Sequence, residues 1–172
     1  ACAGASSPDC TEAGVGVTVH VGAIDHAGLR DMKQIPLPIP SGSTPTFDSF
    51  IPGSNAMVLA HLRDLGTQPA PLYLWGPQGS GKTHLLRALA HQTQAQGGRV
   101  GWFDPSEPAP WLHEESWSLI VLDGCDAFDA AQQHAAFALF VEATTHGTSL
   151  VAAGRLPPVD LPLRDDLRSR LG

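Results

Sequence analysis

The residues best suited to chemistry form one octapeptide at positions 76–83. It reads Gly76, Pro77, Gln78, Gly79, Ser80, Gly81, Lys82 and Thr83. Its glycines let the backbone curl so that N–H groups point at phosphate oxygens. Lys82 would neutralise the β- and γ-phosphates of a nucleotide, and the Thr83 hydroxyl would ligate Mg²⁺. A chance glycine turn would look the same, but the apolar run before it and the helical pattern after it favour a phosphate-binding loop.

An acidic residue at the end of a neighbouring strand would complete the magnesium site. Asp123 closes the apolar run at residues 119–122, downstream of Lys82. An ordinary aspartate at a strand end would give the same pattern when taken alone. With the phosphate-binding loop upstream, we interpret Asp123 as the second Mg²⁺ ligand.

The elements that position these residues alternate along the chain. Apolar runs at 71–76, 99–103, 118–123 and 149–153 predict strands. Helical patterns follow at 82–96, 130–145 and 164–171, and an earlier helix runs to about Leu65 from an N-cap at Ser54 or Asn55. The helix at 130–145 is expected to bury one side, which carries Phe137, Phe140 and Val141. The alternation predicts an α/β fold with three layers, in which helices cover both faces of a mostly parallel sheet.

Composition excludes several classes of protein. The chain has 172 residues and a formal net charge of −7, so contact with DNA is expected to be indirect or weak. No apolar run approaches the roughly 18 residues of a membrane span, so no membrane partner is expected. Three cysteines and eight scattered histidines show neither a disulfide framework nor the usual zinc spacings. Cys125 is expected to be a buried thiol.

Three segments together resemble the DnaA-related AAA+ family, and most closely its Hda branch, the regulatory inactivators of the replication initiator DnaA. They are TFDSFIPGSNAMVLAHL at 46–62, PLYLWGPQGSGKTHLLRALA at 71–90 and LPLRDDLRSRL at 161–171. The resemblance covers about residues 32–172. It identifies the octapeptide as the P-loop and Asp123 as the Walker B acid of an AAA+ domain spanning 47–172.

The resemblance also implies partners. Such proteins bind ADP or ATP with Mg²⁺, bind the sliding clamp of DNA polymerase III, and stimulate hydrolysis of ATP held by DnaA. That activity represses replication initiation. The resemblance implies a bacterial cytoplasmic protein that associates with the nucleoid through the clamp. Phe50 and Ile51 would line the adenine side of the pocket, and Arg170 would be an arginine finger acting in a neighbouring subunit. From the residues alone, Arg170 would be a surface arginine. A homo-oligomer is also compatible with this family.

The N-terminal part divides at Met32, a candidate for the native start of the chain. Residues 1–31 are expected to be a disordered extension outside the family, although 17–23 could form a short strand. The proline-rich segment 32–46 resembles the family's clamp-binding peptide. Gln34 would hydrogen-bond at the rim of the partner's pocket, and Leu37 and Ile39 would fill it. A plain proline-rich linker is the alternative. At the other end, the chain is expected to stop before the last strand and the helical lid.

Two departures from the family bear on catalysis. Gly124 stands where hydrolysing relatives carry a second acid, and Asp126 would have to swing back to replace it. Residues 152–155, AAGR, lack the usual polar sensor. We therefore expect a nucleotide-binding activator of a partner rather than an efficient ATPase. The alternatives are an independent P-loop ATPase or kinase, a fragment of DnaA itself, and a helicase loader or clamp-loader subunit.

Overall fold

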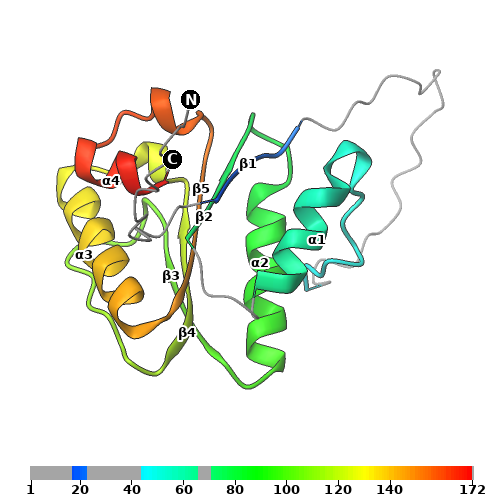
Figure 1. Cartoon of the computed structure of the whole chain (residues 1–172), viewed down its shortest axis with the longest axis horizontal. Helices are drawn as coiled ribbons and strands as arrows, with labels where there is room; N and C mark the ends of the chain where they lie inside the picture. Colours follow the sequence, from blue (N-terminus) through cyan, green and yellow to red (C-terminus); the bar gives the residue numbers. More distant parts are fainter. Residues whose placement is uncertain (1–16, 23–43, 66–70, 172) are drawn as a thin grey trace, which may run out of the picture.

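The computed structural model describes residues 17–22, 44–65 and 71–171, and Figure 1 shows their arrangement. The described residues form one five-stranded sheet in the order β1-β2-β5-β4-β3, in which all neighbours are parallel. The strands are β1 (Val17–His20), β2 (Leu72–Trp75), β3 (Arg99–Phe103), β4 (Trp117–Asp123) and β5 (Ser149–Gly154).

Helices cover both faces of this sheet, which confirms the predicted three-layer α/β fold. One face carries α1 (Ala56–Asp64) and α2 (Lys82–Ala95), and the other carries α3 (Ala130–His146) and α4 (Asp165–Leu171) (Figure 1). Short 3₁₀ turns lie at Gly53–Asn55, Cys125–Ala127 and Pro158–Asp160. No helix among the described residues is long and apolar enough to cross a membrane.

The apolar strands follow from this layering, because a strand between two helical layers buries the side chains of both its faces. In β4, Leu119 and Val121 join the core beneath α1 and α2. The intervening Ile120 and Leu122 join the core beneath α3 and α4. The expected inward faces of the helices at 56–64 and 82–95 are buried as predicted. Their buried residues include Leu59, Leu62, Leu85, Leu86, Leu89 and Ala90.

The structure corrects two local expectations and confirms a third. Asn55 precedes α1 but its side chain makes no cap there; it accepts a 3.0 Å bond from the Gly22 N–H instead. Val141 is 39% exposed, while Phe140 on the same helix is buried. The reason is that only a narrow stripe of α3 meets the sheet. The short strand considered possible at 17–23 is present at Val17–His20, which forms β1 beside β2.

Candidate nucleotide-binding site

The predicted phosphate-binding loop joins the carboxyl end of β2 to the start of α2. Gly79 and Gly81 have φ of 81° and 91°, a backbone region that suits glycine. At Gly76 a Cβ would collide with the Val21 carbonyl oxygen, so no larger residue fits beside β1. The three glycines therefore allow this loop to curl and to approach the segment after β1 closely.

The Lys82 ammonium group lies across the loop. Its Nζ donates to the carbonyl oxygens of Gly76 and Pro77, both at 2.8 Å, and to Ser80 Oγ at 3.2 Å. Burial lowers the pKa of Lys82, and the carboxylates of Asp123 and Asp126 act in the opposite direction. The positive charge is thus held at the centre of the loop, where a phosphate would enter.

The two predicted Mg²⁺ ligands lie side by side. Thr83 Oγ1 donates a 2.8 Å hydrogen bond to Asp123 Oδ2. Burial raises the pKa of the Asp123 carboxyl, and its bond from Thr83 acts against that rise. A hydroxyl and a carboxylate that meet beside a phosphate-binding loop fit Mg²⁺, which prefers oxygen ligands and keeps several waters.

A cavity of about 380 Å³ opens over the loop. Its walls come from the loop, from the segments after β3 and β4, and from the end of β5. They include Lys82, Thr83, Pro105, Asp123, Gly124 and Arg155. A larger cavity of about 490 Å³ involves Leu65, Gly97 and Gly147, and no titratable side chain lines it. The smaller cavity is therefore the one with the chemistry to bind a nucleotide.

Asp126, the acid that would have to replace the one absent at Gly124, is engaged elsewhere. It accepts from Arg155 N at 3.1 Å and from Arg155 Nε at 2.6 Å. Its side chain is only 5% exposed. Asp126 therefore fixes Arg155 at the cavity wall, and its carboxylate oxygens are occupied by this arginine.

The Phe50 ring packs on the loop rather than lining the cavity. A Cβ at Gly81 would lie 2.6 Å from Phe50 Cε2. The centroid of the Phe50 ring lies 5.7 Å from that of His84. Ile51 is 74% exposed. Neither Phe50 nor Ile51 is among the residues that line the cavity over the loop.

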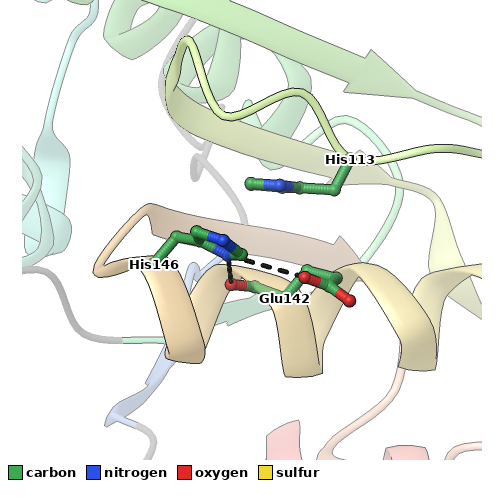
Figure 2. Close-up of side chains that lie close together, drawn as sticks. All are labelled: His113, Glu142 and His146. Carbon is green, nitrogen blue, oxygen red and sulfur yellow. Dashed lines mark hydrogen bonds and ion pairs between the residues drawn. The ribbon is translucent and has the colours of Figure 1, made fainter.

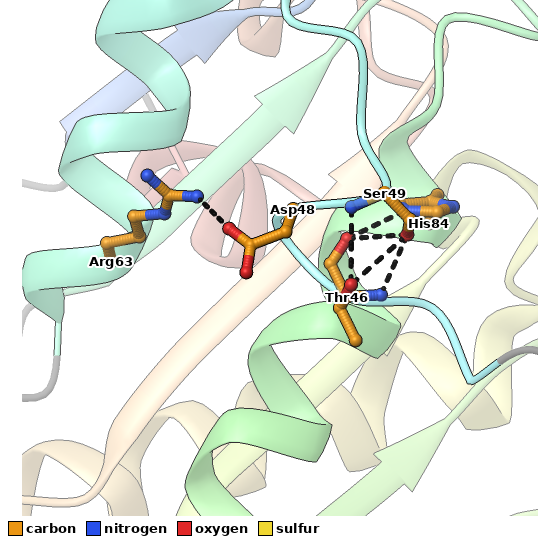
Figure 3. A network of polar contacts seen from close by, with 5 residues as sticks. All are labelled: Thr46, Asp48, Ser49, Arg63 and His84. Atoms are coloured by element: carbon orange, nitrogen blue, oxygen red, sulfur yellow. Dashed lines mark hydrogen bonds and ion pairs between the residues drawn. The ribbon is translucent and has the colours of Figure 1, made fainter.

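His84, in the first turn of α2, fixes the segment that carries Phe50. Its Nε2 lies 3.1 Å from the Thr46 carbonyl oxygen and 3.2 Å from Ser49 Oγ (Figure 3). On the other side of this segment, Asp48 forms a 2.8 Å ion pair with Arg63 of α1. The segment is thus bonded to both helices on this face of the sheet.

Arg170 lies away from the cavity over the loop. Its guanidinium carbon is 5.8 Å from the ring centroid of Phe137 and 5.6 Å from that of Phe140. Its side chain is exposed. Three other arginines of the C-terminal part are paired with aspartates, in Arg155–Asp126, Arg164–Asp166 and Arg168–Asp165. Neighbouring carboxylates therefore neutralise the charges of these three arginines.

The structure brings together the loop residues 76–83 and Asp123, as the sequence predicts, and places Phe50 beside them. The clamp-peptide residues Gln34, Leu37 and Ile39 lie outside the described residues. Sequence reasoning missed His84 and Arg155 as parts of the site. Each carries a positional signal, because His84 directly follows the P-loop threonine and Arg155 directly follows a strand end.

The family model and the three solved structures compared with this chain are all of DnaA, the replication initiator. Residues 42–103 match the family model described as the bacterial DnaA ATPase domain. A replication initiator DnaA bound to AMPPCP and single-stranded DNA is 21% identical to this chain, with a TM-score of 0.65. The match covers 75% of this chain and 47% of that DnaA chain. AMPPCP-bound DnaA from Aquifex aeolicus is 22% identical with a TM-score of 0.62, covering 75% and 48%.

Domain III of DnaA from Thermotoga maritima is 21% identical with a TM-score of 0.63, covering 77% of this chain and 65% of its own. The chain thus spans about half the length of the first two DnaA structures. Likeness at this identity establishes the fold. This chain is therefore an α/β P-loop domain with the fold of the DnaA AAA+ module, and its residues 42–103 also match that domain in sequence.

Proposed function

We propose that this chain is a regulatory AAA+ protein of the Hda type, which binds ADP or ATP with Mg²⁺ and stimulates hydrolysis of ATP bound to DnaA. It acts in the bacterial cytoplasm as a negative regulator of replication initiation. The observation that carries the proposal is a site equipped for binding but not for activating water. Lys82 donates to the loop carbonyl of Gly76 and Thr83 donates to Asp123, while Asp126 is bonded to Arg155.

Arg170 supports the activating role. An arginine finger must reach the γ-phosphate of a neighbouring subunit, where it stabilises charge in the transition state. Arg170 is exposed and has no part in lining the chain's own phosphate cavity. Its contacts with Phe137 and Phe140 are cation–π contacts worth about 0.5–1 kcal/mol at an exposed site, weak enough to exchange for a phosphate.

Clamp binding rests on the sequence of residues 34–39, Gln-Ile-Pro-Leu-Pro-Ile. Its prolines restrict the unbound peptide, which reduces the entropy lost on docking. Gln34 would donate at the rim of the clamp's pocket, and Leu37 and Ile39 would enter it. Pulldown of the clamp by the wild-type chain, lost in Gln34→Ala, tests this part separately.

The activating role is tested by mixing the chain with DNA-loaded clamp and ATP-bound DnaA, and following ADP formation. Arg170→Ala should abolish stimulation while leaving clamp binding and nucleotide binding intact. Arg168→Ala is the matched control, because it removes an arginine of the same helix that is paired with Asp165. Equal stimulation by wild type and Arg170→Ala would refute the role of Arg170, and no stimulation by wild type would refute the proposal.

A second candidate is the ATPase module of an initiator, since the matched family model and structures are those of DnaA. The two functions differ in what the nucleotide controls. An initiator module should assemble with itself when ATP replaces ADP, which sedimentation would detect without DnaA present. A regulator should show stimulation of DnaA in the assay above without that self-assembly.

A further inference from the structure

A cluster of metal-binding side chains lies on α3, apart from the nucleotide site. Glu142 and His146 are one turn apart near the end of α3, and His113 reaches them from the segment between β3 and β4 (Figure 2). One ligand atom from each residue lies within 4.8 Å of the other two. Glu142 and His146 are neighbours on one helix, but His113 comes from a separate segment, so no spacing motif in the sequence reveals the set of three.

The hydrogen bonds of His146 leave one of its ring nitrogens ready for a ligand. Its Nδ1 lies 2.9 Å from the Glu142 carbonyl oxygen and 3.5 Å from Glu142 Oε2. A proton on Nδ1 is donated to the carbonyl oxygen, and the lone pair is then on Nε2. A carbonyl bonded to one nitrogen is the usual way in which proteins orient a metal-binding imidazole through the other.

His113 has an unmet need for a partner. Its Nε2 is buried and has no hydrogen-bond partner among the described residues. The His113 and His146 rings face each other, with centroids 5.0 Å apart and planes inclined by 24°. Leaving a buried polar atom unpaired is unfavourable, so a ligand that satisfies it would be favoured.

The surroundings leave room for an ion with its waters. A cavity of about 450 Å³ adjoins the cluster, and Glu115 is another residue that lines it. Two imidazoles and one carboxylate are donors that suit Zn²⁺ and its neighbours in the transition series, whereas Mg²⁺ and Ca²⁺ require mostly oxygen. We propose that His113, Glu142 and His146 bind one divalent transition-metal ion of the Zn²⁺ class, with water completing its coordination. Binding requires the two stacked imidazoles to rotate so that their in-plane lone pairs converge on the ion.

Such an ion would connect the segment before β4 to the last turns of α3. It would bind the folded chain in preference to the unfolded one, because the donors converge only after folding. Binding should therefore raise the melting temperature in proportion to the logarithm of ion concentration.

Calorimetric titration of the full chain with Zn²⁺, paired with thermal unfolding, tests the proposal. His113→Ala and His146→Ala should each lose one Zn²⁺ binding event and the associated rise in melting temperature. Glu142→Gln, a conservative change at an exposed position, should weaken the same event, and it keeps the test available if a histidine variant fails to fold. His91→Ala is the control, since it removes an exposed histidine of α2.

Co²⁺ provides a second readout, because its visible absorption reports nitrogen and oxygen coordination. The wild type and His91→Ala should show the same bands, His113→Ala and His146→Ala should lose them, and Glu142→Gln should need more Co²⁺ to reach them. The proposal would be overturned if the three cluster variants bound Zn²⁺ with the same stoichiometry and affinity as the wild type and His91→Ala. Equal binding of Mg²⁺ at this cluster would overturn the assignment of the ion class.

Discussion

Thr83 and Asp123 meet through a 2.8 Å hydrogen bond from Oγ1 to Oδ2, which joins the first turn of α2 to the last residue of β4. These residues are 40 positions apart in the sequence. Their contact places the two expected Mg²⁺ ligands together before any ion is bound. An ion entering with a nucleotide would exchange one hydrogen bond for coordination to both oxygens.

Asp123→Asn should remove the magnesium dependence of nucleotide binding. The neutral amide is a poorer Mg²⁺ ligand than a carboxylate, so we expect the affinity for ADP with Mg²⁺ to fall about tenfold or more, a loss of about 1.4 kcal/mol. Calorimetry with and without Mg²⁺ measures the effect. A variant that keeps the full gain from Mg²⁺ would show that Asp123 is not a ligand.

The same carboxyl predicts a pH dependence. Burial raises the pKa of Asp123 in the folded chain above its ordinary value, so its protonated form appears at higher pH than in an ordinary aspartate. The Mg²⁺-dependent part of the affinity should therefore decline early as the solution is acidified. Buried ionised Asp123 costs stability above its folded pKa, and that cost is relieved as pH falls. Asp123→Asn without Mg²⁺ should be at least as stable as wild type at neutral pH.

Two glycine substitutions separate backbone strain from contact with Phe50. Gly79→Ala and Gly81→Ala both place alanine at positive φ, which costs about 1–2 kcal/mol. Only at Gly81 does the new Cβ meet the Phe50 ring; at Gly79 nothing lies within 4 Å. Gly81→Ala should therefore lower the free energy of unfolding further and weaken nucleotide binding more. Denaturant unfolding measures the difference, and equal losses would mean that Phe50 moves aside freely.

Asp126→Asn addresses whether the chain hydrolyses ATP by itself. Because Asp126 accepts both bonds from Arg155, it should contribute little to activating water, and the basal turnover should change by less than about twofold. The free energy of unfolding should fall by about 1–3 kcal/mol, because a charge-assisted bond to a largely buried carboxylate is lost. A steady-state phosphate-release assay measures turnover. A fall of tenfold or more would instead assign Asp126 the role of the acid missing at Gly124.

Cys125 should resist thiol reagents in the folded chain. Its thiol is buried, and burial raises its pKa to about 12, so the reactive thiolate is scarce at neutral pH. With Cys2 and Cys10 replaced by serine, labelling should occur only on unfolding and accelerate with denaturant. Rapid labelling of the native variant would contradict the burial of this residue.

The layered fold was predictable because its signals are local. Each strand buried on two faces is a continuous apolar run, such as Leu119 to Leu122, and each helix shows its own period. The phosphate-binding loop is also local, since eight consecutive residues define it. Side-chain pairings across the sheet are not local. The bond between Arg155 and Asp126 spans 29 positions, and nothing in either segment alone indicates which partner the aspartate takes.

The placement of Phe50 shows the same limit. Resemblance assigns this residue to the adenine side of the pocket, but its ring packs on Gly81 and beside His84. The direction of the side chain depends on bonds from His84 to Thr46 and Ser49, which join segments that lie more than thirty positions apart. Such contacts become visible only when the chain is folded.

The position of β1 has a practical consequence for anyone preparing this protein. β1 pairs with the whole of β2, and Val21 continues the ladder with a 2.6 Å bond to the Trp75 carbonyl oxygen. A protein expressed from Met32 onward would lack β1, which pairs with the strand that leads into the P-loop. β2 would then be an exposed edge strand that can pair with another molecule. The shortened protein should therefore aggregate unless another strand takes the place of β1.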